Sequence, residues 1–406
     1  MKKNEIFNAA VVVAALGYFV DVYDLVLFLV IGKKSLADIG VPSELILEKF
    51  KFLLDVQMVG MLVGGIVWGV LGDKKGRLSV LFGSIITYSL ANIANGFVTD
   101  LNMYTFLRFV AGFGLAGELG AGITLVSEIM SKEKRGYGTM VVASVGVIGA
   151  VVAGFVGKAG WQLAYWIGGG LGLSLLLLRI GVIESGIFNK IKENKVNRGN
   201  FFQLFSNKEI AYKYLNCILI GLPVWFVIGK LVALAPVFAK ELKIAGTIDD
   251  GTCVMLCYSG LVFGDLFSGM LSQYLMSRKK VFMVFYAISL ACVGVYLNLY
   301  GANASFMYLM IFALGFSVGF WAIFVTVASE QFGTNLRATV TTTVPNFVRG
   351  SLVIIGIVFE FFTKQTGLGL IMGTVVVGVI VFSISFLSLF NLKETFGRDL
   401  DFHEIS

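Results

Sequence analysis

The chain contains a series of apolar stretches of about 20 residues, the length that an α-helix needs to cross the hydrocarbon core of a membrane. Hydrophobic residues make up 57% of its 406 residues and charged residues only 14%, which excludes an ordinary soluble domain. The sequence therefore predicts an all-α membrane protein with twelve transmembrane helices, at residues 8–31, 52–71, 79–98, 103–127, 137–157, 162–182, 211–237, 252–275, 281–300, 304–328, 339–362 and 367–390.

The basic residues lie mostly in the short connectors between these stretches. A net charge of +7 is compatible with nucleic-acid binding, but the bases do not gather on one amphipathic face. When the amino terminus is assigned to the cytoplasm, most of the 32 lysines and arginines fall on the cytoplasmic side, as the positive-inside rule requires. We therefore expect both termini in the cytoplasm and no nucleic-acid partner.

The longest connector is polar and divides the apolar stretches six and six. Short motifs repeat on either side of it: the loop at residues 73–77 has a degraded echo at 273–280, and residues 128–135 are mirrored by 330–337. Two related halves of six helices are typical of transporters that rock around a central site. We predict two pseudo-symmetric six-helix bundles, at residues 1–183 and 210–406, joined by a cytoplasmic linker at residues 184–209.

Cysteine and histidine usage excludes several kinds of site. All four cysteines fall within apolar stretches, so we expect buried thiols and no disulfide framework. The single histidine, His403, lies in the polar tail, which leaves no histidine ligand or histidine proton relay in the membrane. The first apolar stretch is too long for the apolar region of a cleavable signal. We expect no metal, no cofactor and no enzymatic activity.

Several motifs recur at the ends of the predicted helices. Residues 69–77 read GVLGDKKGR, residues 108–118 read RFVAGFGLAGE, residues 184–188 read ESGIF and residues 393–395 read KET. They resemble, in that order, the motifs G-x-L-x-D-R-x-G-R-R, R-x-x-x-G-x-G-x-G-G-E, P-E-S-P-x-F and P-E-T of the major facilitator superfamily, although the third lacks both prolines. The resemblance covers essentially the whole chain and is strongest to the metabolite:proton symporter and sugar porter branches.

This resemblance implies a transporter that works by alternating access between two bundles. The predicted function is proton-coupled symport, in the import direction, of a small organic solute that carries a carboxylate. We expect a monomer in the bacterial cytoplasmic (inner) membrane, whose partners are a small-molecule substrate, protons and the lipid bilayer. The alternatives are proton-driven efflux of a drug or siderophore, a sugar or polyol symporter, and a receptor that no longer transports.

Ionisable residues inside the amino-terminal stretches are candidates for proton coupling, because a charge in hydrocarbon needs a partner, an aqueous cavity or a function. Asp21 and Asp24 are three residues apart and share one helix face. Arg108 lies at a depth comparable to Asp24, so a pair across a cavity is reasonable. The resemblance to sugar–proton symporters implicates Asp24 and Arg108 in coupling, with Asp21 as the alternative carboxylate. A permanent buried salt bridge is the competing interpretation.

Glu118, near the middle of the fourth stretch, is a further candidate. Protonation, a structural hydrogen bond and contact with substrate all remain open for it. A second set of residues forms the predicted gate, in which ion pairs between helices lock the cytoplasmic side. The gate residues are Asp73, Arg77, Glu128 and Arg135 in the first half, with Glu330 and Arg337 as their counterparts in the second.

The carboxyl-terminal half contains Lys230, Asp265 and Arg349 within apolar stretches. Basic residues without matching acids favour an anionic substrate, since a guanidinium grips a carboxylate at two points. Two alternatives stand: Asp265 and Arg349 neutralise one another, and Lys230 extends outward to the membrane surface. Tyr23, Trp321 and Asn346 complete the predicted substrate-binding set, because the counterparts of their helices line the cavity in the family that the chain resembles.

Overall fold

The computed structural model describes residues 9–75, 77–120, 122, 126, 135–184, 201–333 and 336–398, and almost all of them are helical. Ten helical stretches among them are long and apolar enough to cross a membrane. The helices α3 and α4 occupy the two remaining positions of the twelve-helix layout. The predicted all-α class and its membrane-spanning helices are thus confirmed.

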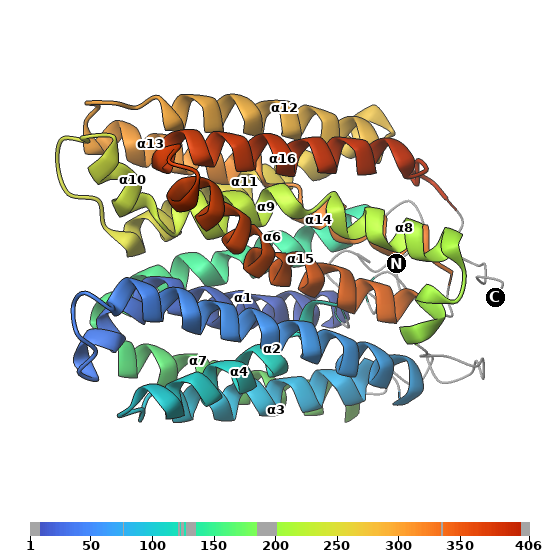
Figure 1. Cartoon of the computed structure of the whole chain (residues 1–406). Helices are drawn as coiled ribbons and strands as arrows, with labels where there is room; N and C mark the ends of the chain where they lie inside the picture. Colours follow the sequence, from blue (N-terminus) through green and yellow to red (C-terminus); the bar gives the residue numbers. More distant parts are fainter. Residues whose placement is uncertain are drawn as a thin grey trace.

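The first half of the chain packs as one bundle (Figure 1). Close contact between its helices depends on glycine: a Cβ added to Gly60 of α2 would collide with the carbonyl of Phe109 on α4, and one added to Gly112 with the carbonyl of Gln57. The elements of this bundle are α1 (Ala9–Asp38), α2 (Ile46–Lys75), α3 (Arg77–Asn95), α4 (Leu101–Leu115), α6 (Arg135–Val156), the 3-10 helix η2 (Gly157–Ala159) and α7 (Trp161–Glu184).

The second half forms the other bundle. Its elements are the 3-10 helix η4 (Phe201–Phe205), α8 (Lys208–Leu219), α9 (Leu222–Phe226), the π-helix η5 (Val227–Val232), α10 (Ala235–Glu241), α11 (Asp250–Leu275), α12 (Arg278–Leu297), α13 (Ala304–Ser317), α14 (Trp321–Gln331), α15 (Arg337–Glu360), the π-helix η6 (Phe361–Gln365) and α16 (Gly369–Asn391). The limits of the two bundles and of the linker stay predictions, because residues 185–200 lie outside the described part of the chain.

Three spans that the sequence predicts as continuous helices are interrupted in the described residues. In the fourth, α4 ends at Leu115 and a turn at Ala116 and Gly117 follows. The seventh is divided into α8, α9, η5 and α10, with a proline near the start of α9 and another near the start of α10. The tenth breaks between α13 and α14, where Gly319 packs directly on the backbone of Gly264 in α11. A proline lacks the N–H that continues a helix, so the breaks in the seventh span have a local cause. A close backbone approach needs glycine, so the break in the tenth span goes with its contact to α11.

The helices run in alternating directions, so the start of α1 and the end of α16 lie at the same end of the molecule (Figure 1). We call this end the terminal face and the opposite end the distal face. The two bundles meet mainly where α2 packs on α15 and where α6 packs on α11. Near the distal face, Lys33 of α1 pairs with Asp250 of α11 at 2.8 Å, and Lys51 of α2 with Glu360 of α15 at 2.9 Å. Ion pairs therefore join the bundles on that side.

Candidate functional site

The candidate site lies midway along α1 and α15, where the two bundles touch. Oδ2 of Asp21 lies 3.7 Å from an Nη atom of Arg349. Both side chains are buried, and among the described residues nothing donates a hydrogen bond to the Asp21 carboxylate. Charges attract strongly in such a low-dielectric setting, but this pair lacks the two short hydrogen bonds of a forked contact. Arg349 is therefore held by charge, but the hydrogen-bond donors of its guanidinium are not all used.

Arg349 has additional partners on its own bundle. Its other Nη donates to Oδ1 of Asn346 at 3.3 Å, and its guanidinium carbon lies 5.7 Å from the centre of the Trp321 ring. Its Nε finds no hydrogen-bond acceptor among the described residues. An unused donor on a buried guanidinium is costly unless something binds there, so this atom is free to receive a carboxylate oxygen.

A small cavity of about 20 Å³ adjoins Arg349. This is room for about one water molecule, so a metabolite enters only if the bundles move apart. Most of the cavity wall is apolar or aromatic and comes from both bundles. The lining residues are Tyr18, Val22, Leu25, Val147, Val224, Trp225, Ile228, Tyr258, Leu261, Trp321 and Arg349.

Asp24 and Arg108 are both buried but do not form the ion pair that the sequence suggested. Arg108 instead donates to the side-chain oxygen of Gln57 on α2 and to the hydroxyl of Tyr165 at 3.4 Å, and it lies over the ring of Phe28 at 4.7 Å. A neutral amide and two rings thus surround the guanidinium. The role of Asp24 and Arg108 in proton coupling stays a prediction.

Glu118 has a partner that sequence reasoning missed. Arg179 of α7 donates to both of its carboxylate oxygens, one of these bonds measuring 3.1 Å, and both side chains are buried. By its position at the end of the sixth apolar stretch, Arg179 would count among the cytoplasmic basic residues of the positive-inside bias. The structure instead places it inside the first bundle, where two hydrogen bonds compensate its burial. Of the three roles left open for Glu118, this contact favours the structural one.

The other predicted substrate residues do not gather at Arg349. Asp265 accepts the backbone N–H of Ala322 at 3.1 Å, at the start of α14, and does not neutralise Arg349. Tyr23 donates to the carbonyl of Ala164 at 2.9 Å, a contact within the first bundle. Lys230 lines a separate cleft at the distal side. Of the six residues predicted to bind substrate, the structure brings together Arg349, Trp321 and Asn346.

The comparison with known families assigns the chain to one of them. Residues 14–357 match the model of the Major Facilitator Superfamily, which is most of the chain. The chain belongs to the major facilitator superfamily. It is thus a membrane transporter and not an enzyme, as the sequence predicts.

Similar proteins within the superfamily transport small molecules. The candidate niacin/nicotinamide transporter NiaP of Bacillus subtilis (strain 168) is 26% identical over 83% of this chain and 84% of its own length. The 3-(3-hydroxy-phenyl)propionate transporter of Escherichia coli (strain K12) is 31% identical over 38% of this chain and 40% of its own. The structure of the proton:xylose symporter XylE has a TM-score of 0.75, covers 99% of this chain and 98% of its own, and is 14% identical, which is a likeness of fold.

The gate motifs of the superfamily are described only in the second bundle. Glu330 pairs with Arg278 of α12 through two contacts, of 3.1 and 3.4 Å. Arg337 donates to the carbonyls of Ser329 and Phe332, each at 3.3 Å. Glu128 and the side chains of Asp73, Arg77 and Arg135 lie outside the described residues, so that half of the predicted gate stays a prediction.

Gln57, Arg179 and Arg278 are the polar partners that sequence reasoning did not assign. Arg179 carries a signal, because it stands alone in an apolar run of leucines and isoleucine. Arg278 also carries one, because it lies in the echo of the loop at residues 69–77. Nothing in the sequence singles out Gln57, since an amide in a membrane helix has no preferred partner until the helices pack.

Proposed function

We propose that this protein is a proton-coupled importer of a monocarboxylate with a small, mostly apolar or aromatic body. The observation that carries the proposal is the Asp21–Arg349 pair. The two residues belong to opposite bundles, lie 3.7 Å apart without a hydrogen bond, and border a central cavity with aromatic walls. Arg349 is thus a cation that suits a substrate carboxylate, and in this structure the carboxylate of Asp21 lies beside it.

Competition for Arg349 supplies a coupling mechanism. A substrate carboxylate that forms two hydrogen bonds with the guanidinium displaces Asp21. Asp21 then lacks a cation in a buried site, where the neutral acid is favoured over the carboxylate. It therefore binds a proton as the substrate binds, and both are released when the original pair re-forms on the other side. Asp24, one turn away on α1, is the alternative proton carrier.

The chemistry of the cavity supports an aromatic or apolar body for the solute. Trp225, Trp321, Tyr18 and Tyr258 supply flat surfaces around Arg349. Niacin and 3-(3-hydroxyphenyl)propionate, named for two similar transporters, each join one carboxylate to one aromatic ring. A cavity of this composition binds such a ring by burial and its carboxylate by charge.

The orientation that goes with this function places the terminal face in the cytoplasm and the distal face outside. The positive-inside bias of the connectors supports it. We further propose that the protein lies in a bacterial inner membrane, acts as a monomer, and closes its cytoplasmic side with the gate residues of the two bundles.

Counterflow in proteoliposomes tests the function. Benzoate, nicotinate, neutral nicotinamide and xylose are offered as solutes at two pH values. We expect exchange of the two carboxylates only, and their accumulation when an inward proton gradient is imposed. Exchange of xylose or nicotinamide with no exchange of carboxylates contradicts the proposal.

Asp21→Asn separates coupling from binding. The variant removes both the titratable group and the competitor for Arg349, so we expect exchange of benzoate to persist while accumulation driven by the proton gradient is lost. Asp24→Asn is the matched comparison on the same helix. If Asp24→Asn alone loses accumulation, Asp24 carries the proton and the competition mechanism is wrong.

A further inference from the structure

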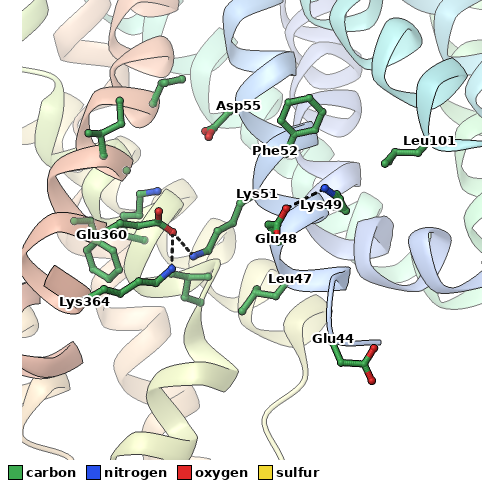
Figure 2. Close-up of a pocket in the computed structure, with 16 residues that line it drawn as sticks. Glu44, Leu47, Glu48, Lys49, Lys51, Phe52, Asp55, Leu101, Glu360 and Lys364 are labelled. Atoms are coloured by element: carbon green, nitrogen blue, oxygen red, sulfur yellow. Dashed lines mark hydrogen bonds and ion pairs between the residues drawn. The ribbon is translucent and has the colours of Figure 1, made fainter. Parts of the chain in front are cut away.

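A second cavity opens at the distal side of the molecule, between α2, η5 and α15 (Figure 2). It has a volume of about 590 Å³, within the usual range for sites that bind small molecules. It shares no lining residue with the central cavity at Arg349. The larger cavity, which we call the distal cleft, therefore lies outside the site described above.

Three of the four lysines that line the distal cleft already contact a glutamate. Lys51 and Lys364 both contact Glu360, at 2.9 and 3.3 Å, and Figure 2 shows this bridge between α2 and α15. Lys49 pairs with its neighbour Glu48 at 2.9 Å. Lys230 is the exception among the described cleft lysines, since it has neither a hydrogen bond nor a direct ion pair, although Asp55 and Glu360 on the same wall lie close enough to act on its charge. One ammonium of the cleft thus remains available to an anion.

Three features of η5 and α15 fix the position of Lys230. The residue lies in the π-helix η5, a rare form that is frequent at functional sites. A Cβ added to Gly356 of α15 would lie 2.9 Å from its Nζ, so the glycine leaves a notch for the ammonium. The ring of Phe359 lies 5.9 Å from Nζ. Lys230 is only 9% exposed, which shows that its head group is held against the wall and does not extend freely into solvent.

The remainder of the wall is largely apolar. Leu47, Phe52, Leu101, Leu234, Val353 and Ile357 contribute hydrocarbon surface. From this arrangement we infer that the distal cleft is a separate binding site for a monocarboxylate, in which the carboxylate contacts Lys230 and the apolar body lies against this surface. The inference rests on the proposed function for the class of ligand.

Acidic residues on the same wall limit the ligand to one negative charge. Asp55 lines the cleft without an ion pair, and Glu360 and Glu44 lie on it as well. A second carboxylate on the ligand would face these groups, and like charges close together repel. We therefore expect benzoate to bind and phthalate, its 1,2-dicarboxylate analogue, to bind much more weakly.

The distal cleft and the central cavity are lined by nearby residues of η5 and α15. Ile228 of η5 lines the central cavity and Lys230, two residues later, lines the cleft. On α15, Arg349 and Gly356 are seven residues apart, which is about 10 Å along a helix axis. The cleft thus lies about two helical turns nearer the distal face than Arg349, and a solute that enters from the distal side meets the cleft first.

The test uses the full-length protein in proteoliposomes, with the four native cysteines replaced by alanine and with Lys230→Cys. The substitution removes a charged contact, so the apparent KM for benzoate uptake should rise by roughly tenfold, with the maximal rate unchanged. Treatment with 2-aminoethyl methanethiosulfonate adds an ammonium to the new thiol and should restore the KM. Methyl methanethiosulfonate adds a neutral group and should not.

Ligand protection gives a direct readout of binding. Benzoate should slow modification of the thiol in Lys230→Cys, and phthalate at equal concentration should not. Lys240→Cys is the matched control, because Lys240 is exposed on α10 and does not line the cleft. Its modification should be insensitive to benzoate. Equal modification rates with and without benzoate in Lys230→Cys overturn the inference, as does an equal KM after both reagents.

Two further variants keep the test decisive. If Lys230→Cys does not fold, Gly356→Ala displaces the ammonium from its notch and should raise the KM in the same way, and an unchanged KM contradicts the site. Adding Arg349→Gln separates the inference from the proposed function: benzoate should still protect the thiol of Lys230→Cys although uptake is lost. If protection disappears with Arg349, the cleft is no independent site. If counterflow shows no carboxylate transport, the proposed function fails whatever the cleft binds.

Discussion

Glu118, which follows the end of α4, and Arg179 on α7 form an ion pair that lies wholly within the first bundle. Asp21 and Arg349, in contrast, are contributed by different bundles. Rocking of two rigid bundles leaves contacts inside a bundle intact and breaks those between bundles. The first pair is therefore structural throughout the cycle, and the second has to separate in each cycle.

Removing one member of the Glu118–Arg179 pair should destabilise the protein strongly. Glu118→Gln or Arg179→Met leaves a buried charge without its partner, at a cost of about 3–5 kcal/mol. The double variant Glu118→Leu/Arg179→Met removes both charges and should recover most of the loss. Thermal unfolding in detergent measures this. A double variant that is less stable than either single variant would show that the pair is not self-contained.

Replacing Arg349 should impair substrate binding even when the positive charge is kept. Arg349→Lys retains the charge but loses the planar fork that grips a carboxylate at two points. Arg349→Gln loses both, and removal of a buried charged partner costs about 2–5 kcal/mol, so benzoate affinity should fall by roughly 30-fold or more. Binding to purified protein is the measurement, with Lys158→Gln on the exposed distal surface as control. Unchanged affinity in Arg349→Gln would remove Arg349 from the site.

The Lys51–Glu360 pair should hold the distal side closed, but weakly. Both side chains are partly exposed, at 27% and 44%, and such pairs contribute about 0.2–1 kcal/mol. Lys51→Glu should therefore speed modification of Lys230→Cys from outside by up to about fivefold. Adding Glu360→Lys re-forms a pair of reversed polarity and should slow it again, and high salt should reduce the difference. Identical rates in the single and double variants would exclude a role for charge.

Glu394 should make stability depend on pH near the terminal face. Burial works to raise its pKa, but hydrogen bonds from the Ser277 hydroxyl and from backbone N–H groups of Arg278, Phe396 and Lys279 outweigh it and lower the pKa below its usual value. Because the pKa is lower in the folded state, the carboxylate stabilises the folded protein at pH values above its pKa in the unfolded state. This stabilisation is lost as the pH falls through the pKa of the folded state. We expect Glu394→Gln to lower the unfolding temperature at pH 7 and to flatten its decline in acid. Parallel acid profiles for both proteins would contradict this.

The helical architecture could be predicted from the sequence because the hydrocarbon core of the membrane imposes it. Apolar stretches of membrane length and basic connectors are local patterns, and they gave the spans and the two halves. The break at 318–320 was not predicted, because it depends on the contact of Gly319 with Gly264, which belongs to another helix. The interruptions of the seventh span lie at prolines, a local signal that the prediction of a continuous span did not use.

The ionisable residues of the site could be found in the sequence, but not their pairing. Arg349 was selected because a cation in an apolar stretch is unusual, and the structure places it at the interface. Its partner was expected to be Asp265 or a substrate and is Asp21, because pairing across bundles depends on the rotation of each helix about its axis. Arg108 donates to Gln57 and not to Asp24 for the same reason. Sequence spacing alone does not fix that rotation between separate helices.

Asn346 binds the two bundles together through a single amide, which donates to the carbonyl of Ala116 across the interface and to that of Thr342 in its own helix, each at 2.8 Å. Ala116 follows the last residue of α4, where the regular backbone ladder stops. When the terminal face opens, this carbonyl loses its donor and needs another at once. Water is the available replacement, so water has to enter the gap between the bundles as they separate. A gap that admits less water would slow this separation and therefore the transporter.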